Sequence, residues 1–571
     1  MRPAGWEAVS VDDAVVGALA AALKLRPLTA RILLGRGLGG VEAAQRFLEP
    51  RLADLRPPEG MADLGKALDR IAAALSARET IGVFGDYDVD GVTTAAVLAT
   101  TLRAFGGQVV PRCASRDAGY GLGVDDVTRF AADGCRVLVT GDCGTSDHEA
   151  LRHARTLGLD VIVIDHHQLP EGESAAYALI NPRRPDDAFP FKGLASCGVA
   201  FYLAAALRSR LRDARPGVGA GFDPRELLDL VALGTIADVV PLVDENRILV
   251  AHGLRALAAR KRPAIAALAT IAELEDRPMT AHDVGFRLAP RLNAAGRLGE
   301  AQLALDLLLA PDAATAARLA AELEDRNTER QRIQEIVWAE ALAAAAEHVE
   351  ADAAAVVVSA EGWHPGVVGI IAARLVDKFA RPAVVVGFRG EEGRGSARTV
   401  PGFDLFAALS RAAEHLVRFG GHAAAAGMSV TPAGMDGFRR RFNAAIREQS
   451  AGRATPPLRV DAVVGLGELD VPFTEELARL APFGAANAEP LFAVRDLTTQ
   501  ATRRVGQGHL QLTLADATFG AFADAIAFGM ADRDPGMGAS LDLLATAELD
   551  TFRGTRRARL KVRQLIPHPN A

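Results

Sequence analysis

Three acidic residues stand at every second position in the segment Gly85-Asp86-Tyr87-Asp88-Val89-Asp90-Gly91. In an extended backbone this spacing places alternate side chains on one face, so at least two of the carboxylates can reach one site. Hard divalent cations such as Mg²⁺ and Mn²⁺ bind several oxygen ligands, and clustered carboxylates would repel one another without a cation. Taken alone, the segment leaves a catalytic metal site and a polar turn equally open. A calcium loop of this pattern would need a terminal glutamate and two flanking helices.

Three further polar segments follow along the chain. Asp142 lies in Gly141-Asp142-Cys143-Gly144, although a lone Asp at such a place is more often a helix cap. Asp165-His166-His167 is more specific, because adjacent histidines are uncommon and an imidazole ligand favours Mn²⁺ or another transition metal. Asp238 lies among apolar residues, where an unpaired carboxylate would be unfavourable.

Short buried strands are the elements that must position these groups. Apolar runs at Ile81–Phe84, Arg136–Thr140 and Val161–Ile164 each end directly before a polar segment, and helical patterns such as Gly91–Phe105 lie between them. Such runs predict a parallel sheet with helices on both faces. Open α/β sheets bind ligands at the carboxyl ends of their strands, so we expect the polar segments to converge there.

The rest of the chain divides into further units. Residues up to about Pro57 have the pattern of a small helical lead-in, and Ala301–Glu350 predicts one or two long connecting helices. A second α/β pattern begins at Ala355 and runs to about Gln449. After a break near Arg453–Pro457, alternating segments indicate the short antiparallel strands of a small barrel, at Leu458–Asp461, Leu510–Leu514 and Ala525–Phe528.

Composition excludes little. The 571 residues are 49% hydrophobic and 24% charged, which is typical of folded domains, and the formal charge of −7 does not decide whether the chain binds nucleic acid. The four cysteines form no Cys-x-x-Cys pair, so a zinc site or redox dithiol is not expected. Neither a signal peptide nor a long apolar run is recognisable, and we therefore expect a cytoplasmic protein without membrane spans.

In this order and after these strands, the four polar segments resemble the motifs of the DHH phosphoesterase superfamily. The resemblance implies a centre of two ions, Mn²⁺ or Mg²⁺. Its implied metal ligands are Asp88, Asp90, Asp142, His166 and Asp238, with Asp142 bridging both ions. It assigns catalytic roles to Asp86 and His167, which would tune the site, hold a water molecule or contact phosphate. Phe84 stands where several pyrophosphatase relatives have a histidine, which disfavours a pyrophosphatase and leaves the ligands of the first ion less defined.

Downstream segments resemble a fifth motif, at Arg291–Arg297, and the DHH-associated domain, at Gly362–Ile370, Gly395–Arg398 and Phe419–His422. A guanidinium group can donate two parallel hydrogen bonds to the oxygens of a phosphate, and glycines let backbone N–H groups approach an anion closely. The implied substrate-binding residues are Arg291, Asn293, Arg297, His364, Ser396, Arg398 and His422. The alternative to substrate binding is that the arginines are surface helix residues paired with acids. The histidines would then have structural roles.

The lead-in segments Arg31–Gly37 and Phe47–Pro50, with the tail segments Pro482–Pro490 and Gly508–Leu510, resemble the RecJ family within this superfamily. The implied α/β architecture comprises a lead-in (1–57), a DHH catalytic domain with a parallel sheet (58–250), a helical connector (251–350), a DHH-associated domain (351–452) and an OB-fold barrel (453–571). Candidate strand-binding residues of the barrel are Arg503, Arg504, Arg553, Arg556, Arg557, Arg559, Lys561 and Arg563.

This resemblance implies a monomeric exonuclease that acts on single-stranded DNA in repair and recombination. It would digest from the 5′ end, release 5′-mononucleotides, and work beside a single-strand-binding protein and a helicase. One alternative is a DHH phosphodiesterase for short oligoribonucleotides or cyclic dinucleotides, which would not need the tail. Another is an inactive scaffold of a replication complex, against which the intact acidic and histidine residues argue.

Overall fold

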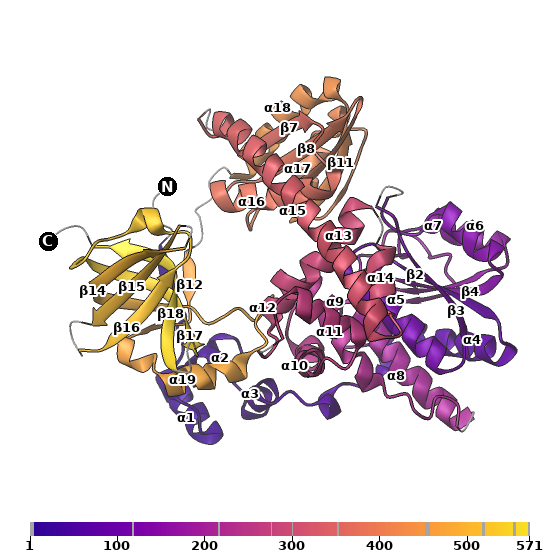
Figure 1. Cartoon of the computed structure of the whole chain (residues 1–571), viewed down its shortest axis with the longest axis horizontal. Helices are drawn as coiled ribbons and strands as arrows, with labels where there is room; N and C mark the ends of the chain where they lie inside the picture. Colours follow the sequence, from indigo (N-terminus) through magenta and orange to yellow (C-terminus); the bar gives the residue numbers. More distant parts are fainter. Residues whose placement is uncertain are drawn as a thin grey trace.

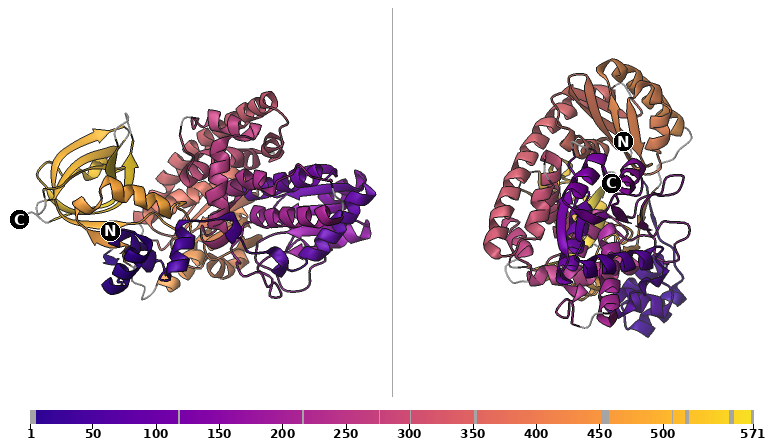
Figure 2. Two further views of the ribbon diagram at one scale, coloured as in Figure 1. Left: turned by 90° about the horizontal axis from the view of Figure 1, so that it is seen from below. Right: turned by 90° about the vertical axis from the view of Figure 1, so that its right-hand side faces the viewer.

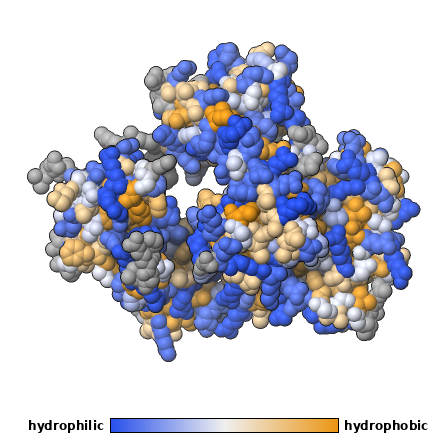
Figure 3. Space-filling view, in the orientation of Figure 1, coloured by the Kyte–Doolittle hydropathy of each residue, from blue (hydrophilic) through white to orange (hydrophobic). Residues whose placement is uncertain are grey.

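The computed structural model describes residues 5–116, 119–214, 217–275, 277–299, 301–350, 353–450, 457–506, 508–516, 520–551 and 556–568. Two α/β units and a β-barrel surround an opening (Figure 1), which the space-filling view also shows (Figure 3). The barrel and the first α/β unit lie at opposite ends of the long axis, as a second direction of view confirms (Figure 2, left).

The first α/β unit is built on five parallel strands in the order β3-β2-β4-β5-β6. The strands are β2 (Thr80–Gly85), β3 (Gln108–Cys113), β4 (Cys135–Gly141), β5 (Asp160–Ile164) and β6 (Ala178–Ile180). Their helices are α4 (Leu64–Ala77), α5 (Val89–Ala104), α6 (Val124–Ala132), α7 (His148–Thr156) and α8 (Ser196–Ala214). Side chains of α4, α5 and α8 pack in one core and those of α6 and α7 in another, which confirms the predicted sheet covered on both faces.

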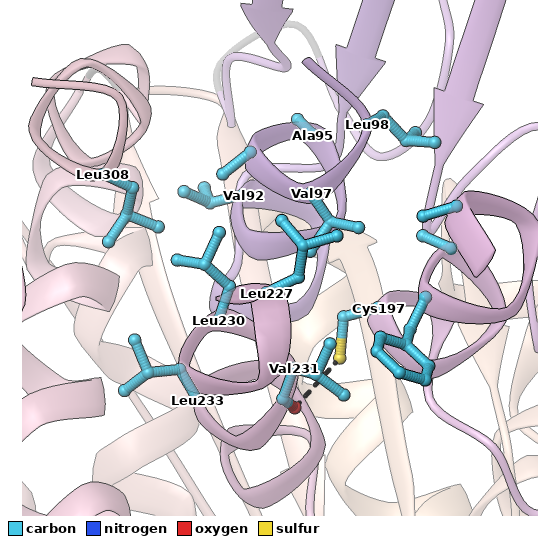
Figure 4. Close-up of a cluster of buried hydrophobic side chains, with 14 of the residues drawn as sticks. Val92, Ala95, Val97, Leu98, Cys197, Leu227, Leu230, Val231, Leu233 and Leu308 are labelled. Carbon is cyan, nitrogen blue, oxygen red and sulfur yellow. Dashed lines mark hydrogen bonds between the residues drawn. The ribbon is translucent and has the colours of Figure 1, made fainter. Parts of the chain in front are cut away.

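A helical region continues from this unit. It consists of α9 (Leu228–Ala237), α10 (Asp244–Ala259), α11 (Pro263–Ile271), α12 (Ala281–Asp283), the π-helical segment η4 (Val284–Leu288), α13 (Ala289–Leu298), α14 (Gln302–Leu308) and α15 (Ala313–Glu350). Figure 4 shows how α5 and α9 pack through Val92, Leu230 and their neighbours. One core extends from Met61 to Leu323, and α10 runs through position 250, so the helical region is continuous with the sheet. As predicted, α15 is a long connecting helix, with 38 residues.

The second α/β unit contains a five-stranded sheet in the order β10-β11-β9-β8-β7, in which β7 and β8 alone run parallel. Its elements are β7 (Val356–Glu361), α16 (Pro365–Phe379), β8 (Ala383–Arg389), β9 (Glu392–Arg398), α17 (Leu405–Ser410), β10 (Arg418–Gly421), β11 (Ala425–Val430) and α18 (Pro432–Ser450). Helix α16 packs on α15 through a core around Trp363 and Ile371, so the long helix joins the two α/β units.

The last unit is a closed barrel, because β14 pairs with both β15 and β17. Its strands are β14 (Phe492–Val505), β15 (His509–Asp516), β16 (Phe522–Ala527), β17 (Ser540–Asp550) and β18 (Arg557–Pro567), and β13 (Ala462–Val464) adds to β14 at the edge. The prediction that Leu458–Asp461 forms a strand of the barrel is wrong. Strand β12 (Leu458–Val460) instead pairs in parallel with β1 (Trp6–Ala8), a contact between distant parts of the chain that local alternation cannot reveal.

The lead-in therefore contains a strand as well as the expected helices α1 (Asp13–Leu23), α2 (Pro27–Gly35) and α3 (Val41–Leu48). Apolar residues of these helices share one core with the barrel and with helix α19 (Val471–Leu477). The two ends of the chain thus form one packed body. Among the described residues, no helix is both long and apolar enough to cross a membrane.

Candidate metal centre and phosphate pocket

The loop after β2 is held close to the start of α5 by two glycines. A Cβ on Gly85 would lie 2.3 Å from the carbonyl oxygen of Gly91, and one on Gly91 would lie 2.5 Å from the nitrogen of Asp86. Asp88 caps α5 by accepting a hydrogen bond from the N–H of Gly91 at 3.1 Å. The tight turn therefore directs Asp86, Asp88 and Asp90 to the carboxyl edge of the sheet.

Asp90 and Asp142 are buried beside the first turn of α8. The carboxylate of Asp90 accepts hydrogen bonds from the N–H groups of Ser196, at 2.7 Å, and Cys197, at 3.0 Å. Asp142 follows β4 with a φ of 65°, and its Oδ1 accepts a hydrogen bond from the Ser196 hydroxyl at 3.0 Å. The N-terminus of α8 thus holds two carboxylates from different strand ends in place.

Asp165 orients the adjacent histidines. Its Oδ1 accepts hydrogen bonds from the N–H of His166 at 2.7 Å and lies 2.7 Å from Nδ1 of His167. Burial acts to raise the pKa of Asp165, but the hydrogen bonds from His167 outweigh it and lower that pKa to about 2. Burial also opposes protonation of His167, yet its hydrogen bond to Asp165 raises the pKa of His167 to about 9.

His166 connects the strand ends to α9. Its Nε2 lies 3.4 Å from Oδ1 of Asp142 and 3.4 Å from Oδ2 of Asp238, which ends α9. Within the described part of the chain, neither ring nitrogen of this buried histidine has a hydrogen-bond partner. Burial lowers the pKa of His166, which favours the neutral imidazole that binds metals.

The donor atoms gather into three groups, each spanning less than 4.8 Å: Asp86 with Asp88 and Asp142, Asp90 with His166 and Asp238, and Asp142 with His166 and His167. Asp142 belongs to two of them, as expected of a bridging ligand. Burial and the carboxylates of Asp90 and Asp88 raise its pKa well above the usual value. For the same reasons the pKa of Asp238 rises to about 8. The repulsion among these buried oxygens would be relieved by divalent cations, so the residues present fit a two-ion centre.

Asp86 is more completely enclosed than the sequence indicates. It is 1% exposed, and neither carboxylate oxygen has a hydrogen-bond partner among the described residues. Burial and the neighbouring Asp88 raise its pKa well above the usual value. Two unpartnered buried oxygens beside Asp88 and Asp142 suit a metal ligand as well as the tuning role expected from the sequence.

Tyr120 is a site residue that the sequence analysis missed. Its hydroxyl donates a hydrogen bond to the carbonyl oxygen of Asp142 at 3.0 Å and lies 3.1 Å from Nδ1 of His167. Gly119 and Gly121, with φ of 112° and 89°, allow the chain to turn on both sides of it. A tyrosine between two glycines was the signal available in the sequence.

Four arginines from separate elements converge beside the metal ligands. Burial and the charges of Arg116, Arg330 and Arg398 lower the pKa of Arg297 to about 10, while Asp88 acts in the opposite direction. Arg398 donates to the Ser396 hydroxyl at 2.8 Å, and a Cβ on Gly369 would lie 3.1 Å from that oxygen. Several guanidinium groups beside a hydroxyl and close backbone are suited to bind an anion. We call Arg116, Arg297, Arg330, Ser396 and Arg398 the arginine pocket.

Arg116 and Arg330 were not singled out from the sequence. Arg116 lies over the ring of Tyr87 and donates to the carbonyl oxygen of Gly296 at 2.9 Å, which joins the sheet to α13. Arg330 lies on α15. Neither arginine belongs to a recognisable sequence motif, so only the tertiary structure shows that both lie near Arg297.

The remaining predicted substrate residues lie in different surroundings. Arg291 forms an ion pair with Glu324 at 2.6 Å and donates to two carbonyl oxygens, so its guanidinium joins α13 to α15 and the region before α12. Asn293 is half-buried on α13. His364 caps α16, its Nδ1 accepting from the N–H of Gly366 at 3.0 Å, and Arg297 donates to the Gly366 carbonyl. His422 is exposed after β10 and bonds through its N–H to Ala425, which pairs with Arg398.

Four of the candidate strand-binding arginines of the barrel pair with acids. Arg557 pairs with Asp524 at 3.0 Å, Arg559 with Glu548 at 2.6 Å, and Arg556 with Glu475. Arg563 lies 3.8 Å from Glu489, and Arg503 donates to Gln511. Arg553 lies outside the described residues. The acid pairs of Arg556, Arg557, Arg559 and Arg563 are typical of a solvated charged face.

Fold and site together define a phosphoesterase of the DHH class. Family models match in chain order: the N-terminal domain of the DHH family at 80–235, the DHHA1 domain at 352–448 and the RecJ OB domain at 460–564.

Full-length relatives narrow the class further. The single-stranded-DNA-specific exonuclease RecJ of Bacillus subtilis is 35% identical over 98% of this chain and 70% of its own length. The Escherichia coli enzyme of the same name is 36% identical over 95% of this chain and 96% of its own length. The structure of RecJ from Thermus thermophilus with Mn²⁺ matches with a TM-score of 0.85 and 31% identity, over 100% of this chain and 81% of that one. The chain belongs to the RecJ family.

Proposed function

We propose that the chain is a metal-dependent exonuclease that degrades single-stranded DNA from its 5′ end and releases 5′-mononucleotides. The observation that carries the proposal is Asp142, a buried carboxylate shared by two groups of metal-ligating atoms next to the arginine pocket. Family membership supports the same activity, because the relatives are named single-stranded-DNA-specific exonucleases.

Asp88 and Asp142, with Asp86, would hold one Mn²⁺ or Mg²⁺, and Asp90, His166 and Asp238 would hold a second with Asp142 between them. When bound, the two ions supply an activated water and stabilise charge on the phosphoryl group in flight. Asp165 holds His167 protonated and oriented through Nδ1, and the Tyr120 hydroxyl lies 3.1 Å from the same nitrogen. His167 is therefore suited to donate a hydrogen bond to a phosphate oxygen at the exposed side of the centre.

The arginine pocket is suited to the terminal phosphate of the strand. Arg297 and Arg398 would bind its oxygens, with Ser396 as a further donor, while the next phosphodiester lies at the metal centre. A pocket that holds a terminal phosphate beside the hydrolytic site yields mononucleotides and sets the direction of digestion. His364 and His422 lie near Arg297 and Arg398 through backbone contacts and would line the approach.

The opening between the three bodies (Figure 3) would be the route for the substrate. A single strand would pass between the barrel and the catalytic unit, while a duplex would be excluded by width. Contacts to backbone phosphates and stacked bases would give little sequence preference.

We further propose that the enzyme is monomeric and cytoplasmic and acts in DNA repair and recombination. It would cooperate with a single-strand-binding protein and a helicase. We propose the same domain boundaries as in the sequence analysis: 1–57, 58–250, 251–350, 351–452 and 453–571.

End-labelled single-stranded DNA tests the proposal directly. With Mn²⁺, a strand labelled at its 5′ end should release labelled mononucleotide at once, and a strand labelled at its 3′ end should shorten progressively. A 5′-phosphorylated strand should be preferred over one with a 5′-hydroxyl. Release of mononucleotides from the 3′ end first would refute the polarity, and exclusive cleavage of dinucleotides would favour the oligonucleotide phosphodiesterase.

A further inference from the structure

An exposed aromatic pair lies on the same continuous helix as Arg297. Phe286 is 71% exposed, and its ring stacks on that of His282 with centroids 4.5 Å apart and 25° between the planes. Stacked rings at this spacing offer an outer face to a third planar group.

The backbone beneath the pair is fixed in place. Asp283 is buried, accepts hydrogen bonds from the N–H and hydroxyl of Thr280, and pairs with Arg277. Val284 and Leu288 belong to the main core, whereas His282 and Phe286 project from the opposite side. The π-helical turn at Val284–Leu288 widens the helix at this point, a feature frequent at functional sites.

The pair is close to the metal centre and faces the route of the strand. A Cβ on Gly285 would lie 3.7 Å from Ile236, two residues before the ligand candidate Asp238. Helix α12, which carries His282, lies on the side of the catalytic unit that borders the opening and faces the barrel (Figure 1). Apolar surface is visible at that border in the space-filling view (Figure 3).

We propose that Phe286, supported by His282, is a base-stacking subsite for an unpaired nucleotide of the DNA strand, a few nucleotides from the 5′ end. The inference rests on the proposed function. Phe286 precedes Arg297 by eleven residues of one helix, which corresponds to roughly 16 Å at ~1.5 Å per residue. With at least ~3.4 Å per nucleotide, that length reaches no further than about the fifth nucleotide. The helix thus relates the stacked base to the phosphate in the arginine pocket.

Binding of a long strand separates this role from catalysis. Phe286→Ala should raise the Kd for long single-stranded DNA, measured in EDTA, between ~5-fold and ~150-fold, the range for loss of one stacked base. The rate at which the variant hydrolyses a 5′-phosphorylated trinucleotide should change much less, because little or none of so short a strand reaches the aromatic pair. Phe286→Tyr keeps the ring and should bind as the parent does. Leu157→Ala, which removes an exposed apolar side chain next to α7, is the matched control.

A fluorescent base locates the subsite. 2-Aminopurine placed at successive positions from the 5′ end should be quenched most strongly at one position within the first five or so nucleotides, and Phe286→Ala should abolish that maximum. If Phe286→Ala lowers the melting temperature, Phe286→Leu is used in its place, because leucine keeps the apolar volume without the aromatic ring. Unchanged Kd and an unchanged quenching profile in these variants would overturn the subsite. If the parent protein neither binds nor digests single-stranded DNA, the proposed function fails instead.

Discussion

Asp142 is the residue on which both halves of the proposed metal centre would depend. Because its carboxylate belongs to the groups around Asp86 and around His166, its loss would affect both of them. We expect Asp142→Asn to reduce Mn²⁺-dependent digestion by ~100-fold or more, since ligand loss exceeds the effect of changing outer contacts. Binding of single-stranded DNA should persist because the arginine pocket is unchanged. Digestion rate and DNA affinity of the variant, beside Asp186→Asn as an exposed control, measure the two effects.

Residual activity within a few-fold of the parent would contradict the assignment of Asp142 as a shared ligand. Loss of DNA binding together with activity would instead indicate that the substitution disturbs the fold, which circular dichroism can detect. The control separates removal of a carboxylate at the centre from removal of one at the surface.

The protons held by the centre make metal affinity dependent on pH. The pKa of Asp238 is raised to about 8 by burial and by Asp90 and Asp88, so below pH 8 a proton competes with the cation. Affinity for Mn²⁺ should therefore fall as pH falls through 8. Titration calorimetry in buffers of different ionisation enthalpy should detect proton release on binding. Equal affinity at pH 6 and pH 9, without proton release, would contradict this.

At the scale of elements, Arg247 fastens three parts of the chain together. It lies on α10, is 2% exposed, and donates to the carbonyl oxygens of Phe47 at 2.7 Å, Leu480 at 2.9 Å and Ala481 at 2.8 Å. Its guanidinium also lies 3.6 Å from the centre of the Phe47 ring. One side chain thus connects both the lead-in and the segment before the barrel to the catalytic unit.

We expect Arg247→Met to lower the free energy of unfolding by about 3 kcal/mol or more, because several buried carbonyl oxygens lose their donor. Thermal unfolding and limited proteolysis near residues 49–57 should both reveal the loosened contact. Arg255→Met, an exposed position of the same helix, should leave both unchanged. Equal melting temperatures for the two variants would show that the contact contributes little.

At the scale of the whole molecule, we expect the opening to set which substrates reach the centre. The barrel and the catalytic unit lie on two sides of it, and the two ends of the chain are packed together on the barrel side. We expect a hairpin with a 5′ single-stranded tail to be trimmed to within a few nucleotides of the duplex and no further, while a blunt duplex stays intact. Sequencing gels of the products give the stopping point. Digestion that continues through the paired region would contradict exclusion by width.

The sequence by itself determined the parallel sheet, the long connecting helix and the identity of most metal-ligand candidates. These follow from local causes, since buried runs specify strands, helical patterns specify crossovers, and acids directly after a strand must lie at its carboxyl edge. The choice of Asp88, Asp142 and His166 as ligands came from the family resemblance, which needs no knowledge of distant contacts. The small barrel was expected, although β12 was assigned to it in error.

The tertiary structure alone decided which polar residues meet. Asp238 joins His166 because α9 packs on α5, and Arg116, Arg330 and Arg398 reach Arg297 from elements with no sequence motif in common. It likewise separated two arginines of one motif, pairing Arg291 with Glu324 while Arg297 enters the pocket. Side chains one or two turns apart on a helix look alike in sequence, and only the packing of neighbouring elements distinguishes a structural ion pair from an anion site.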